Sequence, residues 1–300
     1  TWQATTLRIP MADAAVTVTG AGLPAAGVNV YLFSADGAYL GKSQSTDDLG
    51  AVRFRLPAQT YRFRADYQAN QYWSGDAVLE AGVENPVLIS VGGGNVSLTI
   101  EKDNGEPLAG INSYVFTDGG TYLGLKGATD ENGQVSFELA DGGFKFRTDY
   151  LGYQFWSDPL TVPDTLAQIL TIPHTDISAT FQGRCQAAIQ PLEGRRVYLF
   201  TPSDAYQGQY RDTDADGRAV FNLPDQTYQL RCDELGRQYW SDSFQSRDTT
   251  VTVPMGQAVI HVTASGDPAE NARVYLFGDA DRYLGEYRVA DGGGTVRFTL

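Results

Sequence analysis

The stretch Val28-Asn29-Val30-Tyr31-Leu32-Phe33 decides the fold, because its apolar residues alternate and its Tyr-x-Phe end recurs along the chain. The later copies are Tyr114-Val115-Phe116, Tyr198-Leu199-Phe200 and Tyr275-Leu276-Phe277, at spacings of 83, 84 and 77 residues. Repetition at nearly constant spacing predicts a tandem array of one structural unit.

Two further motifs follow each of the first three copies. An Arg-x-Asp motif comes first, and a Gln-Tyr/Phe-Trp-Ser motif begins five residues after its Asp. They comprise Arg64, Asp66, Gln71 and Trp73 in copy one, Arg147, Asp149, Gln154 and Trp156 in copy two, and Arg231, Asp233, Gln238 and Trp240 in copy three. The distance from the first tyrosine to the tryptophan is 42 residues in all three copies. We therefore expect the three copies to share one fold without insertions.

Each copy has the pattern of an all-β domain. In copy two, Val96, Leu98 and Ile100 alternate with polar residues, as in a strand with one buried face. Asn132-Gly133 is typical of a hairpin turn. About seven such strands with frequent turns predict an immunoglobulin-like or transthyretin-like β-sandwich. Phe54, Phe137 and Phe221 are predicted at equivalent core positions.

The repeats place the domain boundaries. We expect residues 1–14 to be the last strand of an upstream repeat, with complete repeats at 15–94, 95–175 and 176–257 and an incomplete repeat at 258–300. The first boundary rests on the match of residues 5–11 to residues 249–255. Either the 300 residues are part of a longer array, which we favour, or the N-terminal strand completes the unfinished repeat of another molecule.

Composition excludes several classes of protein. The chain is 42% hydrophobic and 12% aromatic, which is too rich in aromatic residues for a disordered chain. Its formal net charge of −14 opposes binding to nucleic acid, so no nucleic-acid partner is expected. No apolar run approaches the roughly 18 residues that cross a bilayer, so no membrane insertion is expected.

The repeated motifs resemble those of two domain families. Gly-Val-Asn-Val-Tyr-Leu-Phe at residues 27–33 and Thr-Asp-x-Asn-Gly at residues 129–133 are similar to carboxypeptidase regulatory-like domains and to Cna B-type domains of bacterial surface proteins. The resemblance implies transthyretin-like sandwiches in an extracellular or cell-surface array. Cna B-type domains often carry a Lys–Asn isopeptide bond. Here the four lysines, Lys42, Lys102, Lys126 and Lys145, share no first-strand position, so such bonds in every repeat are not expected.

The Arg-x-Asp and Trp motifs have two interpretations. In the first, each copy is a sugar-binding platform, on which Trp stacks while Arg, Asp and Gln bind hydroxyl groups. In the second, Arg and Asp share one face of a strand and pair with each other, and Trp covers its own sandwich or packs against a neighbouring repeat. We favour the structural interpretation.

The remaining polar candidates are few. Asp130, Asn132, Asp214 and Asp216 could offer oxygens to calcium, with Asp47 and Asp48 as a weaker equivalent, but the same residues favour hairpin turns. We expect no cofactor unless calcium binds there. His174 and His261 have no Ser, Cys or second His at a motif spacing, so no catalytic residues and no enzymatic activity are expected.

The two cysteines occur in copy three only. Cys185 is in phase with Phe181, and Cys232 is in phase with Tyr228 and Leu230, so both are predicted to point inward. Either they form an inter-sheet disulfide or they are two buried thiols.

The aromatic face leads to the functional hypothesis. Tyr31, Tyr114, Tyr198 and Tyr275 are predicted to point outward, where either their own domain or a neighbour covers them. We expect a non-catalytic structural segment, such as a stalk, adhesin shaft or filament, whose repeats contact their neighbours and self-associate into a fibre. A carbohydrate-binding array and the accessory region of a secreted enzyme or toxin are the alternatives.

Overall fold

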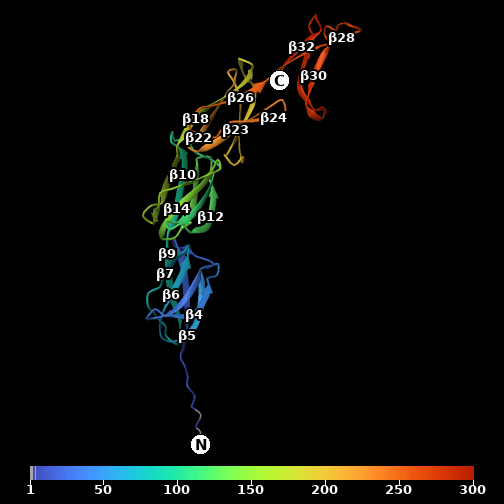
Figure 1. Ribbon diagram of the computed structural model, residues 1–300. Coiled ribbons are helices and arrows are strands. Elements are labelled where there is room, and N and C mark those ends of the chain that lie inside the picture. Colours follow the sequence, from blue (N-terminus) through green and yellow to red (C-terminus); the bar gives the residue numbers. More distant parts are fainter. Residues whose placement is uncertain (1–2, 4) are drawn as a thin grey trace. The chain divides into compact units, whose positions relative to one another are not determined.

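The computed structural model describes residue 3 and residues 5–300, and these are mainly β-strands (Figure 1). The chain divides into two compact units, residues up to Tyr150 with Gln154–Ile172, and Leu151–Tyr153 with Pro173–Leu300. Repeat 1 and all of repeat 2 except Leu151–Tyr153 lie in the first unit, and repeats 3 and 4 lie in the second. Within the described part of the chain, no helix has the length and hydropathy of a membrane span.

Repeat 1 is a sandwich of two sheets. Its first sheet has the order β2-β1-β5, with β9 parallel to β1, and its second has the order β4-β3-β6-β7, with β8 on β6. The strands are β1 (Met11–Gly20), β2 (Leu23–Pro24), β3 (Asn29–Ser34), β4 (Tyr39–Ser45), β5 (Ala51–Pro57), β6 (Thr60–Tyr67), β7 (Asn70–Trp73), β8 (Ala77–Val78) and β9 (Glu84–Gly92).

Repeats 2 and 3 have the same two-sheet plan. In each, the first strand lies between an antiparallel strand and the parallel last strand of the repeat. Repeat 2 contains β10 (Gly94–Lys102), β11 (Asn112–Thr117), β12 (Tyr122–Ala128), β13 (Gln134–Leu139), β14 (Gly142–Tyr150), β15 (Tyr153–Trp156), β16 (Leu160–Val162) and β17 (Ala167–Ile172). Repeat 3 contains β18 (His174–Cys185), β19 (Ala188–Pro191), β20 (Arg196–Phe200), β21 (Tyr206–Asp212), β22 (Arg218–Pro224), β23 (Thr227–Glu234), β24 (Arg237–Trp240), β25 (Phe244–Gln245) and β26 (Thr249–Met255).

Alternation along the strands builds the cores. In β1, every second residue from Ala12 to Val18 is fully buried, while the residues between them are half-buried. Phe54, Phe137 and Phe221 are 2%, 7% and 0% exposed and lie opposite the first strand of their own repeats. The prediction of one shared core position is therefore confirmed. The sequence predicted about seven strands in each repeat. The structure has eight or nine, because short strands such as β8 and β16 pair with the second sheets.

Repeat 4 has only part of this plan. Its small core centres on Ala290, Val296 and Phe298. Its elements are β27 (Gln257–His261), β28 (Thr263–Ala264), β29 (Asp267–Pro268), β30 (Arg273–Phe277), the 3-10 helix η1 (Asp279–Asp281), β31 (Tyr283–Val289) and β32 (Thr295–Thr299). They pair as β27 with β32, β28 with β29, and β30 with β31.

The observed strands shift the expected boundaries. Residues 11–14 belong to β1 of repeat 1 and pair with β5 and β9, so they are not part of an upstream strand. Residues 5–10 form no strand. The boundaries expected after residues 94, 175 and 257 fall one or two residues inside β10, β18 and β27. All three expected boundaries lie too far towards the C-terminus. A single residue separates the last strand of one repeat from the first strand of the next, so no loop in the sequence marks the junction.

Candidate functional site

The repeated motifs meet on the outer face of each second sheet. Tyr31 of β3 lies opposite Arg64 of β6, and Arg64 lies opposite Trp73 of β7. The same row crosses repeat 3 from Tyr198 to Arg231 and Trp240. Directly opposed residues in antiparallel strands bring their side chains together on one face. The spacing in the sequence thus produces a Tyr–Arg–Trp row across three strands.

Arginine is the centre of this row in repeat 1. The guanidinium carbon of Arg64 lies 4.8 Å from the ring centroid of Tyr31, 5.2 Å from that of Phe33 and 5.7 Å from that of Trp73. Its Nε lies 2.7 Å from Asp66 Oδ1, and its Nη2 donates to Asp66 Oδ2 at 2.9 Å. A planar guanidinium suits both contacts at once, since its edge meets the carboxylate while its faces meet aromatic rings.

Repeats 2 and 3 reproduce the arrangement. Arg147 Nε and Arg231 Nε lie 3.0 and 2.9 Å from the carboxylate of the aspartate two residues later. The Arg147 guanidinium lies 4.6 Å from the Tyr114 ring, and the Arg231 guanidinium lies 5.1 Å from the Tyr198 ring. Repeat 2 adds Lys145, whose Nζ lies 5.1 Å from the Trp156 ring. Three copies of one geometry indicate that it serves each sandwich.

The phenylalanine of the Tyr-x-Phe motif is covered within its own repeat. Phe33, Phe116 and Phe200 are 8%, 9% and 6% exposed although they point away from the core. Their rings lie 4.7, 4.9 and 4.8 Å from those of the tryptophans, which are Trp73, Trp156 and Trp240. The outer face is therefore a second, small apolar layer. Phe277, at the equivalent place in β30, is 54% exposed.

An aromatic rim stays in contact with solvent. Trp73, Trp156 and Trp240 are 46%, 42% and 37% exposed, and the neighbouring Tyr39, Tyr122 and Tyr206 are 50%, 45% and 48% exposed. The predicted Gln71, Gln154 and Gln238 are also exposed. Gln71 lies opposite Asp66, at the edge of the row. The structure thus brings Arg, Asp and Trp together and leaves Gln at the margin.

The serine of the Gln-Tyr/Phe-Trp-Ser motif has a role that the sequence alone did not predict. Ser74 Oγ accepts the backbone N–H of Phe63 at 2.9 Å and donates to the Gly75 carbonyl at 2.8 Å. Ser157 and Ser241 accept the equivalent N–H groups of Phe146 and Leu230. A buried hydroxyl here satisfies a backbone donor of an inner strand of the second sheet, between the two short strands that pair with it. The serine recurs directly after each of the three motif tryptophans, and this recurrence could have indicated a structural role.

The buried threonines Thr46, Thr129 and Thr213 were missed in the same way. Each hydroxyl donates to a carbonyl 21 residues earlier and accepts an N–H 18 residues earlier. These bonds tie the segment that precedes β3, β11 or β20 to the residue that directly follows β4, β12 or β21. Repeat 4 has Ala290 at this place, so its loop lacks the contact.

The calcium candidates are turn residues. Asp130 Oδ1 accepts the N–H groups of Asn132 and Gln134, both at 2.9 Å, and Asp214 does the same for Asp216 and Arg218 at 3.0 and 2.8 Å. Within the described residues, no cluster of three or more His, Cys, Asp or Glu is placed to hold a metal. The aspartates thus stabilise hairpins through their own backbone.

The two cysteines are free thiols, so the disulfide alternative is wrong. Cys232 is fully buried in the core of repeat 3, whereas Cys185 is only half-buried at the end of β18, beside Met255. Alternation along a strand determines on which face of the sheet a side chain lies, but not how far along the sheet it lies. The sequence therefore could not decide whether Cys185 and Cys232 form a disulfide. Burial raises the pKa of the Cys232 thiol to about 12.

Repeats 1 and 2 are joined by direct contacts inside the first unit. Gln68 Nε2 donates to the Glu138 carbonyl at 3.0 Å, and Gln68 Oε1 accepts the N–H of Ala140 at 2.8 Å. Tyr72 donates its hydroxyl to the Asp141 carbonyl at 2.5 Å, and burial raises the pKa of Tyr72 to about 12. The turn between β6 and β7 is thereby fixed to the turn between β13 and β14.

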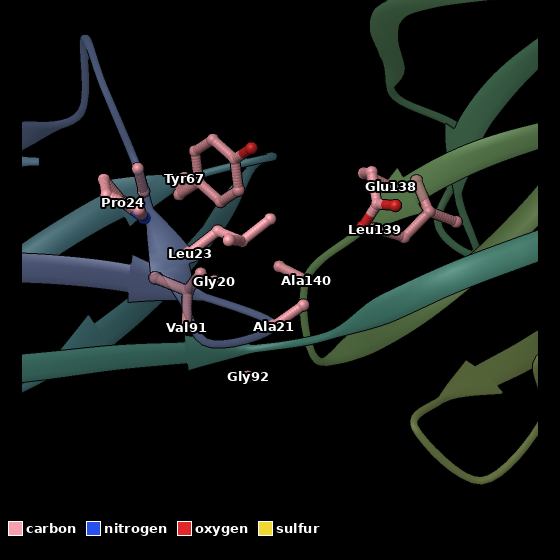
Figure 2. A pocket seen from close by; sticks show the side chains of 11 residues that line it. Gly20, Ala21, Leu23, Pro24, Tyr67, Val91, Gly92, Glu138, Leu139 and Ala140 are labelled. Carbon is pink, nitrogen blue, oxygen red and sulfur yellow. The ribbon is translucent and has the colours of Figure 1, made fainter. Parts of the chain in front are cut away.

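A small pocket of about 160 Å³ lies at this junction. Figure 2 shows Leu23 and Tyr67 of repeat 1 on one side and Leu139 with Ala140 of repeat 2 on the other. Ala140 also packs with the buried core of repeat 1. The pocket is smaller than ordinary ligand sites of roughly 300–1,000 Å³, so it is a packing gap between repeats.

No protein-family model and no curated protein sequence matches the chain. Similar solved structures include the TIE protein of Bacillus anthracis, with 14% identity and a TM-score of 0.30 over 82% of this chain and 51% of that one. The present chain thus spans about half the length of that protein.

Two further solved structures are similar at equally low identity. The minor pilin GBS52 of Streptococcus agalactiae has 14% identity and a TM-score of 0.32, over 57% of this chain and 99% of that one. Two B repeat units of the Staphylococcus aureus collagen-binding protein have 14% identity and a TM-score of 0.23, over 97% and 88% of the two chains. The tandem β-sandwich fold described above rests on the sheets of the chain itself.

Proposed function

We propose that the chain is a structural, non-catalytic repeat segment of an extracellular or cell-surface microbial protein, in which each sandwich serves as a spacer. One observation carries the proposal: the most specific polar residues of the sequence are engaged with each other inside every repeat. Arg64, Arg147 and Arg231 each bind their own aspartate and their own aromatic rings.

The contacts among the motif residues favour a structural role for them over a catalytic role. An active site normally occurs once and combines groups that interact with a substrate. Here the same residues occur three times and interact with one another, which stabilises each second sheet. The surface location rests on the resemblance of the sequence motifs to domains of bacterial surface proteins.

The connections between repeats support a spacer. Only Gly93, Pro173 and Gly256 separate the last strand of one repeat from the first strand of the next. A one-residue connection restricts the relative motion of two domains, and proline restricts it further because its φ is fixed. In the first unit, Gln68 and Tyr72 add hydrogen bonds across the junction.

Single-molecule stretching of the whole chain tests the spacer. We expect three similar unfolding events, each releasing about 25–30 nm of contour length for a repeat of about 80 residues. Small-angle scattering should show the same extended particle at low and high salt. One unfolding event for the whole chain, or a compact particle in every condition, would contradict the proposal.

Carbohydrate binding is a second candidate because three tryptophans keep a solvent-exposed edge. A glycan array should then bind the chain, and replacing Trp73, Trp156 and Trp240 by alanine should abolish binding. Val78→Ala, at an exposed site away from the rim, is the matched control. If the unmodified chain binds no glycan, the carbohydrate-binding function is excluded and the aromatic faces have a structural role alone.

A further inference from the structure

The first and last strands of repeats 1, 2 and 3 lie side by side and run in the same direction. In repeat 1 the parallel ladder extends from Asp13 opposite Glu84 to Gly20 opposite Gly92. The ladder joins eight residue pairs in repeat 1, six in repeat 2 and seven in repeat 3, so no repeat relies on a short contact. The chain therefore enters and leaves each of these repeats through two strands that are bonded to each other.

Tension along the chain acts on this ladder in a particular direction. It pulls β1 from its start, beside Asp13, and β9 from its end, beside Gly92. These two points lie at opposite ends of the ladder, about 23 Å apart at roughly 3.3 Å per residue. Because the ladder bonds run across the strands, this pull slides one strand along the other and strains all the bonds together. A pull at one end of the ladder breaks them one after another.

The ladder of repeat 1 is covered by the core on its inner face. Val16 and Val18 of β1 are fully buried, and Ile89 and Val91 of β9 are 1% and 0% exposed. These side chains exclude water from that face, so a strained bond is not readily replaced by a bond to water. Hydrogen bonds are stronger in such an environment than in water.

Additional hydrogen bonds hold both ends of the same ladder. Where β9 begins, Asn85 Nδ2 donates to the carbonyl of Asp13 at 3.2 Å. Where β9 ends, the N–H of Ala21 donates to the carbonyl of Gly92 at 2.6 Å. The points at which tension reaches the two strands are therefore the points at which extra bonds resist their separation.

We propose that the parallel ladder between the first and last strands is a load-bearing element that keeps repeats 1 to 3 folded under tension. The inference rests on the spacer function and adds to it, because a spacer built in this way transmits force as well as setting a distance. The second sheets lie outside the path of the force, since their strands are connected to one another and to the first sheet within the repeat.

Stretching repeat 1 of the whole chain in two directions tests the proposal. Both variants carry Met11→Cys as the first attachment point, in a background of Cys185→Ser and Cys232→Ala that removes the natural thiols. The second attachment point is Ser90→Cys, near the end of β9, or Val83→Cys, just before β9. Met11, Ser90 and Val83 are all exposed, so the attachments leave the core intact.

The two variants differ in how the ladder is loaded. Pulling between positions 11 and 90 shears it, whereas pulling between positions 11 and 83 opens it from one end. Both extensions release about 25–28 nm, at roughly 3.5 Å per residue. We expect the unfolding force to be at least about twofold higher in shear, because all the residue pairs resist together. Equal forces in the two directions, or a lower force in shear, would overturn the proposal.

A crosslink in the second sheet is the matched control. Asn29→Cys with Ser45→Cys, in the same background, joins β3 to β4 outside the ladder. When the oxidised variant is stretched through its two ends, the event of repeat 1 should release about 5 nm less at an unchanged force. A higher force would place the load in the second sheet and overturn the proposal. Three unfolding events without dependence on direction would also overturn it while leaving the spacer function intact.

Discussion

Replacing Phe221 by alanine should unfold repeat 3 far more often than any surface substitution. Phe221 is fully buried in β22 and lies opposite Ile177 of β18, so its ring fills the space between the two sheets. Truncating a buried phenylalanine to alanine costs about 3–5 kcal/mol. At about 1.36 kcal/mol per tenfold, the population of unfolded repeat 3 should rise roughly 150- to 5,000-fold.

The chain contains its own reporter for this change. Cys232 is fully buried in the same core, and burial raises its pKa to about 12, so its thiol reacts slowly in the folded repeat. In a Cys185→Ser background, the rate at which a disulfide reagent labels Cys232 measures the opening of repeat 3. When closing is fast, that rate is proportional to the open population.

Two controls make the experiment specific. Val220→Ala changes the adjacent residue of β22, which is 53% exposed, and should alter the rate less than about fivefold. Phe137→Ala removes the equivalent ring from repeat 2 and should leave the labelling of Cys232 unchanged, because repeats unfold separately. Equal acceleration by Phe221→Ala and Val220→Ala would refute the assigned core, and strong acceleration by Phe137→Ala would refute separate unfolding.

Three further predictions concern the junction, the hairpin turns and pH. Gln68→Ala should accelerate hydrogen exchange of the Ala140 amide by at least about fivefold, since that amide loses its acceptor, and unchanged exchange would contradict the contact. Asp130→Ala should destabilise repeat 2 by about 1 kcal/mol in chemical denaturation, while calcium or a chelator should leave the unmodified chain unchanged; a calcium-dependent midpoint would instead indicate a metal site. The raised pKa of Cys232 means that folding favours the neutral thiol, so its contribution is complete below the ordinary value of 9.0 and is lost as pH rises towards 12. Cys232→Ala should therefore flatten the loss of repeat 3 stability between pH 9 and 12, and an unchanged slope would assign that loss to other groups.

Much of the fold was predictable because the determining signals are local. Alternation identified β10 from Val96, Leu98 and Ile100, and the constant spacing aligned the repeats well enough to place Phe54 and its equivalents. Boundaries were less accurate. With one residue between consecutive strands, no loop in the sequence marks where a repeat ends, and residues 11–14 were assigned to the wrong strand.

The candidate site was predictable in composition but not in arrangement. The motif spacing identified Arg64, Asp66 and Trp73, and the pairing of Arg with Asp follows from their shared face. The contact of Phe33 with Trp73 does not follow, because those residues are 40 positions apart and meet only through the register of β3, β6 and β7. The role of Ser74 depends on the same register.

The sequence by itself determined the repeat, the all-β class, the inward and outward faces of the strands and the residues of the motifs. These depend on side-chain periodicity, which each strand carries independently of its partners. Only the tertiary structure decided which rings cover which, that Cys185 and Cys232 remain apart, and that Gln68 binds the next repeat. Those facts depend on distances between segments far apart in the chain, and such distances are set by strand register and sheet packing.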